Sequence, residues 1–209
     1  MFKSPFQSLK ATEIIAALIV MVVIGFGLAS NLKNPADTNG LLQLRADGTR
    51  AYANGYTDAR SVSYARKFFK KNPQITTLVL QNMSGTQDAD QNLRIARNIR
   101  RLGLNTHLES DSHIASGAVD LFLAGVNRTA QCGAKIGVHS WSAGGFYDAQ
   151  ESYFDDRRGR QERFLRDMGI DPQFYIFTRE AAPAKGLYVL TSQDIARFTV
   201  TTQAYNCPP

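Results

Sequence analysis

The sequence predicts an α/β domain that follows an N-terminal membrane segment. From residue 41 onward, short apolar runs of strand length alternate with amphipathic runs of helix length, a pattern that favours parallel strand pairing. Before this region, residues 14–32 carry no charged side chain. We therefore divide the 209-residue chain into a membrane segment at 1–32, a linker at 33–40 and one domain at 41–209.

The N-terminal segment indicates where the domain works. Residues 14–32 would span about 28 Å as a helix, close to the thickness of the hydrocarbon layer. Lys3 and Lys10 precede the segment and favour a cytoplasmic N-terminus, with the domain outside the cytoplasm. We expect a single-pass anchor in the inner (plasma) membrane. Gly27-Leu28-Ala29 has the small residues of a cleavage site, so the alternative is a signal peptide and release into the periplasm.

The first half of the domain begins with a hairpin and then alternates helices with strands. Asp47-Gly48 is typical of a two-residue hairpin turn. The helix that follows would be capped by Thr57 or Asp58. In chain order, the expected elements are strands at 41–45 and 49–53, a helix at 58–69, a strand at 75–80, a helix at 90–102 and a strand at 106–108.

The second half begins with a tight turn and becomes less regular after residue 139. Small residues at 115–117 allow that turn between a strand ending at Ile114 and a buried helix. The expected elements are a helix at 118–124, a polar connection at 126–134, a strand at 135–138, helices at 149–168, 173–179 and 193–197, and a terminal strand at 198–202.

A serine and a histidine stand at the ends of two of these strands. Ser116 comes just before the buried helix, where unpaired backbone N–H groups can stabilise a developing oxyanion. The strand at 135–138 delivers His139, which can act as a base. A serine hydroxyl with an imidazole nearby is the pattern of nucleophilic acyl transfer, and we take Ser116 and His139 as candidate catalytic residues.

The motifs around these residues resemble the Clp protease/crotonase superfamily. The resemblance rests on Ala115-Ser116-Gly117-Ala118 before an apolar helix, on Gly137-Val138-His139, and on the strand and Gly-containing loop at 77–85. It spans roughly residues 50–202 and is greatest for periplasmic or membrane-anchored Clp-protease-like proteins. It implies a spiral of ββα units, Ser116 as nucleophile, His139 as base, oxyanion-binding N–H groups at Gly85 and Gly117, and a homo-oligomer.

The third member of a catalytic triad is missing from its expected place. In the resembled peptidases the acid that orients the histidine would fall within residues 184–188, which contain no carboxylate. Glu180, Asp194, Asp148 or a backbone carbonyl could take its place. Because such an acid fixes the tautomer of the imidazole, the sequence leaves open whether the site is active.

A second serine motif competes with the first. Residues 140–145 approximate the G-x-S-x-G elbow of α/β-hydrolases, with Ser142 as nucleophile. That fold needs a histidine after the serine, and none follows Ser142. We therefore interpret this stretch as a Gly-rich turn after the strand of His139.

Composition limits the partners and cofactors. The net charge of +6 is dispersed, and no RNA-binding or zinc-finger motif accompanies it, so we expect no nucleic acid. The three histidines are scattered, so we expect no metal, and nothing indicates another cofactor. Cys132 and Cys207 are the only cysteines, and in an oxidising compartment they are candidates for one disulfide; two unrelated thiols are the alternative.

Three functions fit the sequence. The first is an extracytoplasmic Clp-protease-like serine hydrolase that acts on peptides or proteins. The second is a catalytically inactive protein of the same fold, anchored to the membrane, that binds extended peptides or serves as a scaffold. The third is a crotonase-type acyl-thioester enzyme, which would use the oxyanion hole without needing Ser116.

Overall fold

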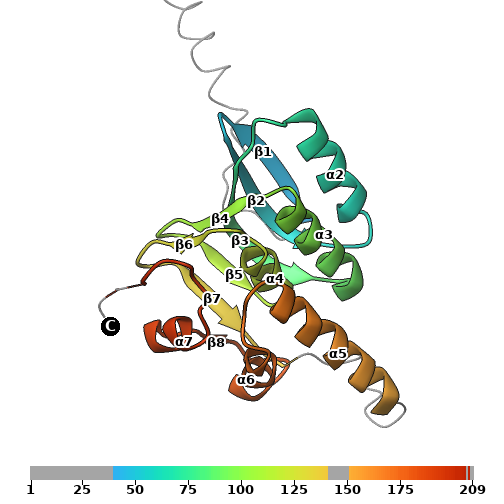
Figure 1. The fold of residues 1–209 in the computed structure, drawn as a ribbon, viewed down its shortest axis with the longest axis vertical. Coiled ribbons are helices and arrows are strands. Elements are labelled where there is room, and N and C mark those ends of the chain that lie inside the picture. The colour runs from blue at the N-terminus through green and yellow to red at the C-terminus, as the bar shows by residue number, and fades with distance from the viewer. Residues whose placement is uncertain (1–39, 141–150, 206, 208–209) are drawn as a thin grey trace, which may run out of the picture. The chain divides into compact units, whose positions relative to one another are not determined.

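A mixed eight-stranded β-sheet runs through the part of the chain that the computed structural model describes, residues 40–140, 151–205 and 207 (Figure 1). Its main path is β1-β2-β3-β5-β7-β8, and β4 joins β3 to β6 beside this path. The inner pairs are parallel, whereas β1–β2 and β7–β8 are antiparallel. The α/β class is confirmed, and the parallel pairing that we predicted holds for the inner strands only.

The strands at the start of the sheet follow the prediction. A two-residue turn at Gly48-Thr49 connects β1 to β2, one residue later than predicted, because Asp47 ends β1 and pairs with Arg50. Gly48 has a φ of +55° that suits glycine. The strands are β1 Gln43–Asp47, β2 Arg50–Thr57, β3 Thr77–Thr86, β4 Asn105–Leu108, β5 His113–Ala115, β6 Arg128–Ala130, β7 Lys135–Val138 and β8 Tyr188–Val189.

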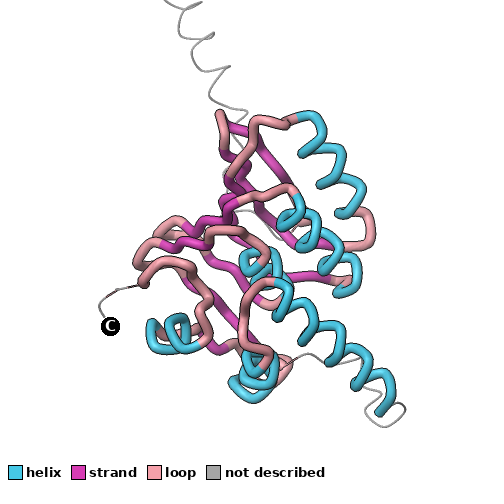
Figure 2. Tube along the Cα trace, in the orientation of Figure 1, coloured by secondary structure: helices cyan, strands magenta, loops and turns pink. Residues whose placement is uncertain are grey.

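Helix α2 packs against α3, α3 packs against α4, and α4 packs against β3; Figure 2 shows these helices in cyan beside the magenta strands. Their apolar faces and the inner residues of β3 form the core, in which Leu80 and Phe122 are fully buried. The helices are α2 Ser61–Lys71, α3 Ala89–Arg101, α4 Gly117–Leu123, α5 Glu151–Asp167, α6 Gln173–Ala181 and α7 Ser192–Arg197.

The sheet divides at β3. Residues 77–79 of β3 pair with β4, whereas residues 82–83 pair with β5. Strands β4 and β5 are consecutive in the chain, so the turn at 109–112 carries the chain from one branch of the sheet to the other. The turn at 131–134 does the same between β6 and β7. As a result, β5 and β7 become parallel neighbours, and their carboxyl ends lie at the same edge of the sheet.

Two sequence-based assignments were wrong. The polar connection at 126–134 contains β6, which forms because its backbone pairs with β4. The predicted terminal strand at 198–202 is absent from the described structure. Its β-branched residues favour a strand, but Thr199 adopts a positive φ of 52°, and the carbonyls of Thr199 and Val200 accept hydrogen bonds from Arg128.

Arg128 is a buried cation that holds three separate segments together. It is 3% exposed, and its guanidinium donates to the carbonyls of Thr199 and Val200 at 3.0 and 2.9 Å. It also donates to the carbonyls of Gly125 and Met168, both at 3.3 Å, which follow the C-terminal ends of α4 and α5. Burial lowers the pKa of Arg128 to about 10. A positive charge at two helix C-termini is stabilised by the carbonyl dipoles there.

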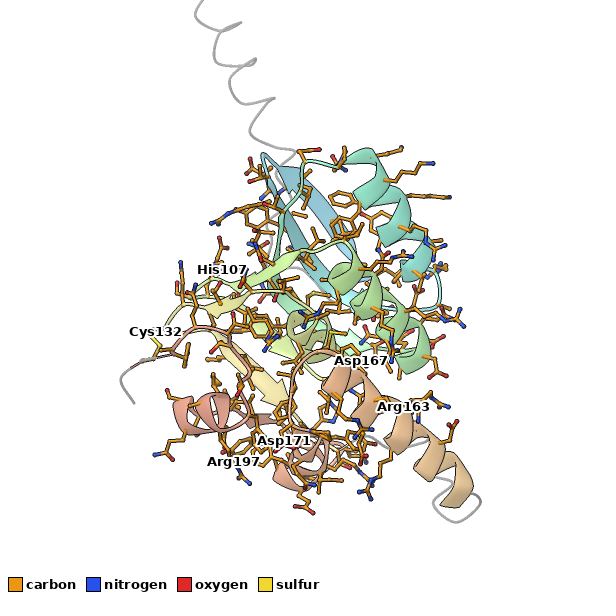
Figure 3. The ribbon with its side chains drawn as sticks, viewed as in Figure 1. His107, Cys132, Arg163, Asp167, Asp171 and Arg197 are labelled. Atoms are coloured by element: carbon orange, nitrogen blue, oxygen red, sulfur yellow. A yellow bond between two sulfur atoms is a disulfide. The ribbon has the colours of Figure 1, made fainter. Side chains whose placement is uncertain are left out.

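The two cysteines are joined in a disulfide. Cys132 and Cys207 have an S–S distance of 2.05 Å, and the bond is visible beside the label of Cys132 in Figure 3. The bond attaches the C-terminal residues to the turn between β6 and β7. Arg128 is the first residue of β6, and Cys132 lies in the turn that follows β6. The disulfide and Arg128 therefore both fix the C-terminal residues near β6 and β7.

The predicted membrane segment, the linker and their boundaries at 32 and 40 fall largely outside the described residues. Within the described part of the chain, every helix is too short or too polar to cross a bilayer.

We predict that Arg128→Met lowers the free energy of unfolding by about 3–5 kcal/mol, because the carbonyls of Gly125, Thr199 and Val200 lose their donor while the volume stays similar; the Met168 carbonyl keeps a hydrogen bond from Arg100. Chemical denaturation followed by circular dichroism measures this change. Arg45→Met is the matched control, since Arg45 is exposed, its ion pair is with the exposed Asp47, and its guanidinium lies over the ring of Tyr52. Its effect should be about 1 kcal/mol or less. Equal effects of the two substitutions would contradict the role assigned to Arg128.

Candidate active site

Ser116 occupies a sharp turn between β5 and α4. Its φ of 56° and ψ of −128° lie in a region that residues with a side chain rarely adopt. The backbone on both sides is fixed, because the N–H of Ser116 donates to the carbonyl of Gly137 at 3.0 Å and the Ser116 carbonyl accepts from Val119 at 2.9 Å. Strain of this kind persists where surrounding contacts hold the residue, and it is often found at functional sites.

Both glycines predicted for the oxyanion hole lie close to this turn. A Cβ on Gly117 would come within 2.5 Å of Thr86 Cγ2. A Cβ on Gly85, whose φ is +128°, would come within 2.9 Å of the Cβ of Ser116. Glycine is therefore required at both positions, and β3 approaches Ser116 as closely as its backbone allows.

His139 lies just beyond the end of β7, with its ring oriented by a backbone carbonyl. Nδ1 is 2.5 Å from the carbonyl oxygen of Ser140. Because a carbonyl oxygen can only accept, this contact assigns the proton to Nδ1 and leaves Nε2 as the basic nitrogen. Within the described residues, the ring makes no hydrogen bond with the hydroxyl of Ser116.

Ser116 and His139 nevertheless line one cavity, which we call the Ser116 cavity. Its volume is about 100 Å³, enough for a few water molecules or one short side chain. The walls combine apolar side chains with hydroxyl, imidazole, carboxyl, amide and guanidinium groups. The lining residues are Thr86, Ala89, Ser116, Gly117, Val119, Asp120, Val138, His139, Arg157, Gln161, Leu165, Phe174, Tyr175 and Thr178.

The structure narrows the choice of the group that orients the imidazole of His139. Asp194 is used elsewhere, since it completes the capping box of α7 with Thr191 and accepts from the hydroxyl of Tyr188. Glu180 lines a different surface pocket, beside Arg197. Asp148 and the rival nucleophile Ser142 lie outside the described residues. The carbonyl of Ser140 is thus the group seen to orient the imidazole.

A carboxyl group that the sequence analysis missed also faces the Ser116 cavity. Asp120 lies one turn after Ser116 on α4, and its Oδ1 accepts a hydrogen bond from Gln161 on α5 at 2.6 Å. Burial raises the pKa of Asp120 to about 7, although hydrogen bonds from Gln161 and Asn92 and the charge of Arg157 lower it in part. The sequence carried a signal for this residue, because Asp120 is the one charged side chain in the apolar run at 118–124.

Asn92 connects Asp120 to the turn of Ser116. The side-chain N–H group of Asn92, on α3, donates to the carbonyl of Gly117 at 2.7 Å and to Oδ2 of Asp120 at 3.3 Å. Its oxygen accepts from the hydroxyl of Thr57 at 2.8 Å. Asn92 is fully buried, and both its side-chain oxygen and its side-chain nitrogen are hydrogen-bonded. Its amide therefore holds Gly117, the first residue of α4, in place.

No cluster of three or more potential metal ligands occurs among the residues that the structure describes. The groups around the Ser116 cavity are a hydroxyl, an imidazole, a carboxyl and a guanidinium, which suit proton transfer and acyl chemistry.

Backbone strain at Ser116 can be measured directly. Ser116→Gly should raise the free energy of unfolding by about 1 kcal/mol, because relief of about 1–3 kcal/mol of strain exceeds the extra entropy of an unfolded glycine. Ser116→Ala keeps a Cβ atom on the strained backbone and should change stability little. If the glycine variant is less stable than the alanine variant, the strain assigned to this turn is wrong.

Asp120 should make stability depend on pH. A carboxyl whose pKa rises on folding binds its proton more tightly in the folded state, so its contribution is greatest in acid and is lost as pH rises through about 7. Asp120→Asn should remove this component. From pH 5 to pH 8, the free energy of unfolding in urea should therefore fall for the wild type relative to Asp120→Asn. A difference that stays constant over this range would contradict the raised pKa.

The fold resembles those of several solved structures at low sequence identity. No protein-family model and no curated protein matches the sequence. The 1510-N membrane-bound stomatin-specific protease, solved as a mutant, is 11% identical, with 75% of this chain and 79% of that chain covered and a TM-score of 0.49. A putative enoyl-CoA hydratase from Streptomyces coelicolor A3(2) is 10% identical, with 84% and 70% covered and a TM-score of 0.46. An enoyl-CoA hydratase from Polaromonas sp. JS666 is 12% identical, with 78% and 70% covered and a TM-score of 0.46. The structural matches of this chain are thus to members of the ClpP/crotonase superfamily, at low sequence identity.

Proposed function

We propose that the protein is a serine hydrolase that cleaves peptides or proteins, with Ser116 as nucleophile and His139 as general base. One observation carries the proposal. A serine held in a strained turn and a histidine whose Nε2 is free of its proton, delivered by adjacent parallel strands, line the same cavity. This is the pair of groups that acyl transfer requires.

In the proposed reaction, the Ser116 oxygen attacks the substrate carbonyl while Nε2 of His139 accepts the hydroxyl proton. The imidazolium then gives that proton to the leaving amine, and a water molecule repeats the sequence to release the acyl group. The N–H groups of Gly117 and Gly85 are the proposed oxyanion donors. The serine and histidine must draw together when substrate binds, as catalytic hydrogen bonds are often formed only in the complex.

The end of β3 supports a peptide as the substrate. Pairing between β3 and β5 ends at Met83 and Ile114, whereas β3 continues to Thr86 alongside β2. On its β5 side, residues 84–86 therefore have no paired strand within the described structure, and this edge lies next to Ser116. An extended peptide could add to it as a strand and present a carbonyl to the hydroxyl of Ser116.

The proposed setting is outside the cytoplasm. The disulfide between Cys132 and Cys207 supports an oxidising compartment, since such bonds persist there and are rare in the cytosol. In this proposal residues 14–32 anchor the domain to the membrane, and the domain works as a homo-oligomer.

A catalytically inactive peptide-binding protein is the second candidate. It is favoured by the lack of a hydrogen bond between Ser116 and His139 within the described residues, and by a carbonyl rather than a carboxylate behind the imidazole. Such a protein would use the same edge of β3 without cleaving the peptide.

Labelling by a fluorophosphonate probe tests the proposal. We expect wild-type protein to be labelled, Ser116→Ala to lose the label, and His139→Ala to react at least about 100-fold more slowly, because the base is gone. Mass spectrometry of the digested protein locates the modified serine, and circular dichroism verifies that each variant is folded.

Two further variants make the test specific. Ser63→Ala removes an exposed hydroxyl on α2 and should leave labelling unchanged. Ser142→Ala tests the rival elbow, and loss of the label in this variant would reject Ser116 as nucleophile. If the folded wild-type protein takes up no label, the serine hydrolase proposal is rejected and the inactive binding protein is favoured.

A further inference from the structure

A second hollow lies on the face of the sheet that points away from α4. Ile114 of β5 and Ile136 of β7 are buried in the core, so the residues that alternate with them point to the opposite face. The hollow on that face has a volume of about 280 Å³, larger than that of the Ser116 cavity. We call it the β5 trough; it is lined by parts of β3, β5 and β7 and by Leu187 and Val189 at β8, which is paired with β7 (Figure 1).

Small residues form the floor of the β5 trough next to Ser116. Ala115 and Gly137 are paired across β5 and β7, and Ser116 follows Ala115 directly. Val189 is paired with Gly137 and is 43% exposed. Leu187 is 55% exposed, and its Cδ1 lies 2.7 Å from the position that a Cβ on Gly137 would take. The trough therefore has an apolar wall that is open to solvent, beside a floor without large side chains.

A row of three hydrogen-bond donors lies at the other end of the β5 trough. Asn82, His113 and Lys135 are in register across β3, β5 and β7, so their side chains share one face of the sheet. They offer an amide N–H, an imidazole N–H and an ammonium group. No residue within the described part of the chain forms a hydrogen bond or an ion pair with any of these three side chains. The residues that line the trough include no carboxylate, so the charge of Lys135 is unbalanced there.

Strand β5 determines how a bound peptide reaches the trough. Residues 82–83 of β3 are paired with β5, whereas residues 84–86 have a free edge on that side within the described structure. A peptide paired with residues 84–86 that continues toward residue 82 must leave the plane of the sheet, because β5 occupies the next position. The face toward α4 is filled by the core, so the peptide passes over the other face. The trough is thus a continuation of the proposed peptide path.

We propose that the β5 trough is a substrate subsite that selects an apolar residue and an acidic residue two positions apart. The apolar side chain lies against Leu187 and Val189, and the carboxylate accepts hydrogen bonds from His113 and Lys135. The spacing follows from the sheet, since His113 and Ala115 are two residues apart on one face and an extended peptide has the same period. The inference rests on the proposed function, because it names the class of peptide that the same site takes.

The carboxylate belongs to an Asp or Glu side chain of the peptide. His113 and Lys135 are both exposed, so the polar end of the trough is open and the peptide can continue beyond it. A terminal carboxylate would instead suit a trough that is closed at this end. A hydrogen bond between an ammonium and a carboxylate is about twice as strong as one between neutral groups, so Lys135 favours an acidic residue over its amide.

Peptide binding to full-length protein carrying Ser116→Ala, measured by fluorescence anisotropy at one salt concentration, tests the subsite. The substitution removes the proposed nucleophile, so the peptides stay intact. The probes are labelled, end-blocked peptides that are otherwise uncharged and contain Leu-Ser-Asp, Leu-Asp-Ser, Leu-Ser-Asn or Ser-Ser-Asp, each also made in the reverse order. In one of the two orders, the Leu-Ser-Asp peptide should bind about tenfold more tightly than the other three. Equal affinities in both orders would overturn the subsite.

A charge reversal at Lys135 shows whether the trough is responsible. In the same background, Lys135→Glu should bind a Leu-Ser-Lys peptide more tightly than the Leu-Ser-Asp peptide, which a poorly folded protein would not do. Lys70→Glu is the matched control, because it makes the same change of charge at an exposed position on α2. It should keep the preference for Asp. An unchanged preference in Lys135→Glu, or a reversal in both variants, would overturn the subsite.

The remaining outcomes separate this inference from other assignments. The peptide series on the Ser116→Ala protein alone decides the case if Lys135→Glu does not fold. Binding that requires an unblocked C-terminal carboxylate and ignores the Asp side chain would overturn the assignment to an acidic residue. A protein that reacts with the fluorophosphonate but has no preference among the peptides rejects the subsite alone. A protein that shows the preference without reacting rejects the hydrolase and keeps the trough as a peptide-binding site.

Discussion

The parallel pairing of β5 with β7 is the constraint on which the candidate site depends. Parallel neighbours end at the same edge of a sheet, so the residues that follow them meet there. Here Ala115 is paired with Gly137, and the N–H of the next residue, Ser116, donates to the Gly137 carbonyl. This arrangement arises because β3 divides its pairing between β4 and β5. The turns at 109–112 and 131–134 then bring two distant segments to one branch of the sheet.

A series of polar groups, buried at Thr57 and Asn92 and half-buried at Asp120 and Gln161, supports this edge from the side of the helices. Thr57, Asn92, Asp120 and Gln161 come from β2, the helices α3 and α4, and α5, and each is hydrogen-bonded to the next. Placing polar groups below the surface is costly unless all are paired, and here the pairing fixes the first residue of α4 beside Ser116. Asp120 is the titratable member of this network, and burial raises its pKa to about 7.

Much of the fold could be predicted from the sequence because local pattern and tertiary structure agree. The hairpin around Gly48, the strand at 135–138 and the helix that ends before Gly103 each carry their own turn or cap signals. The failures occurred where a distant partner decided the outcome. β6 forms because β4 supplies its hydrogen bonds, and residues 198–202 give up strand geometry because Arg128 takes two of their carbonyls.

The sequence by itself determined the order of most elements and pointed to Ser116 and His139, because small residues at a strand-to-helix turn and a histidine after an apolar strand are local signals. Gly85 and Gly117 were indicated by the resemblance to a known family. Only the tertiary structure decided which groups surround them. It supplied the carbonyl of Ser140 behind the imidazole, the disulfide that closes the chain end, and the carboxyl of Asp120 facing Gln161. Those contacts join residues from different elements, and their energies depend on burial and distance, which the order of residues along a chain does not specify.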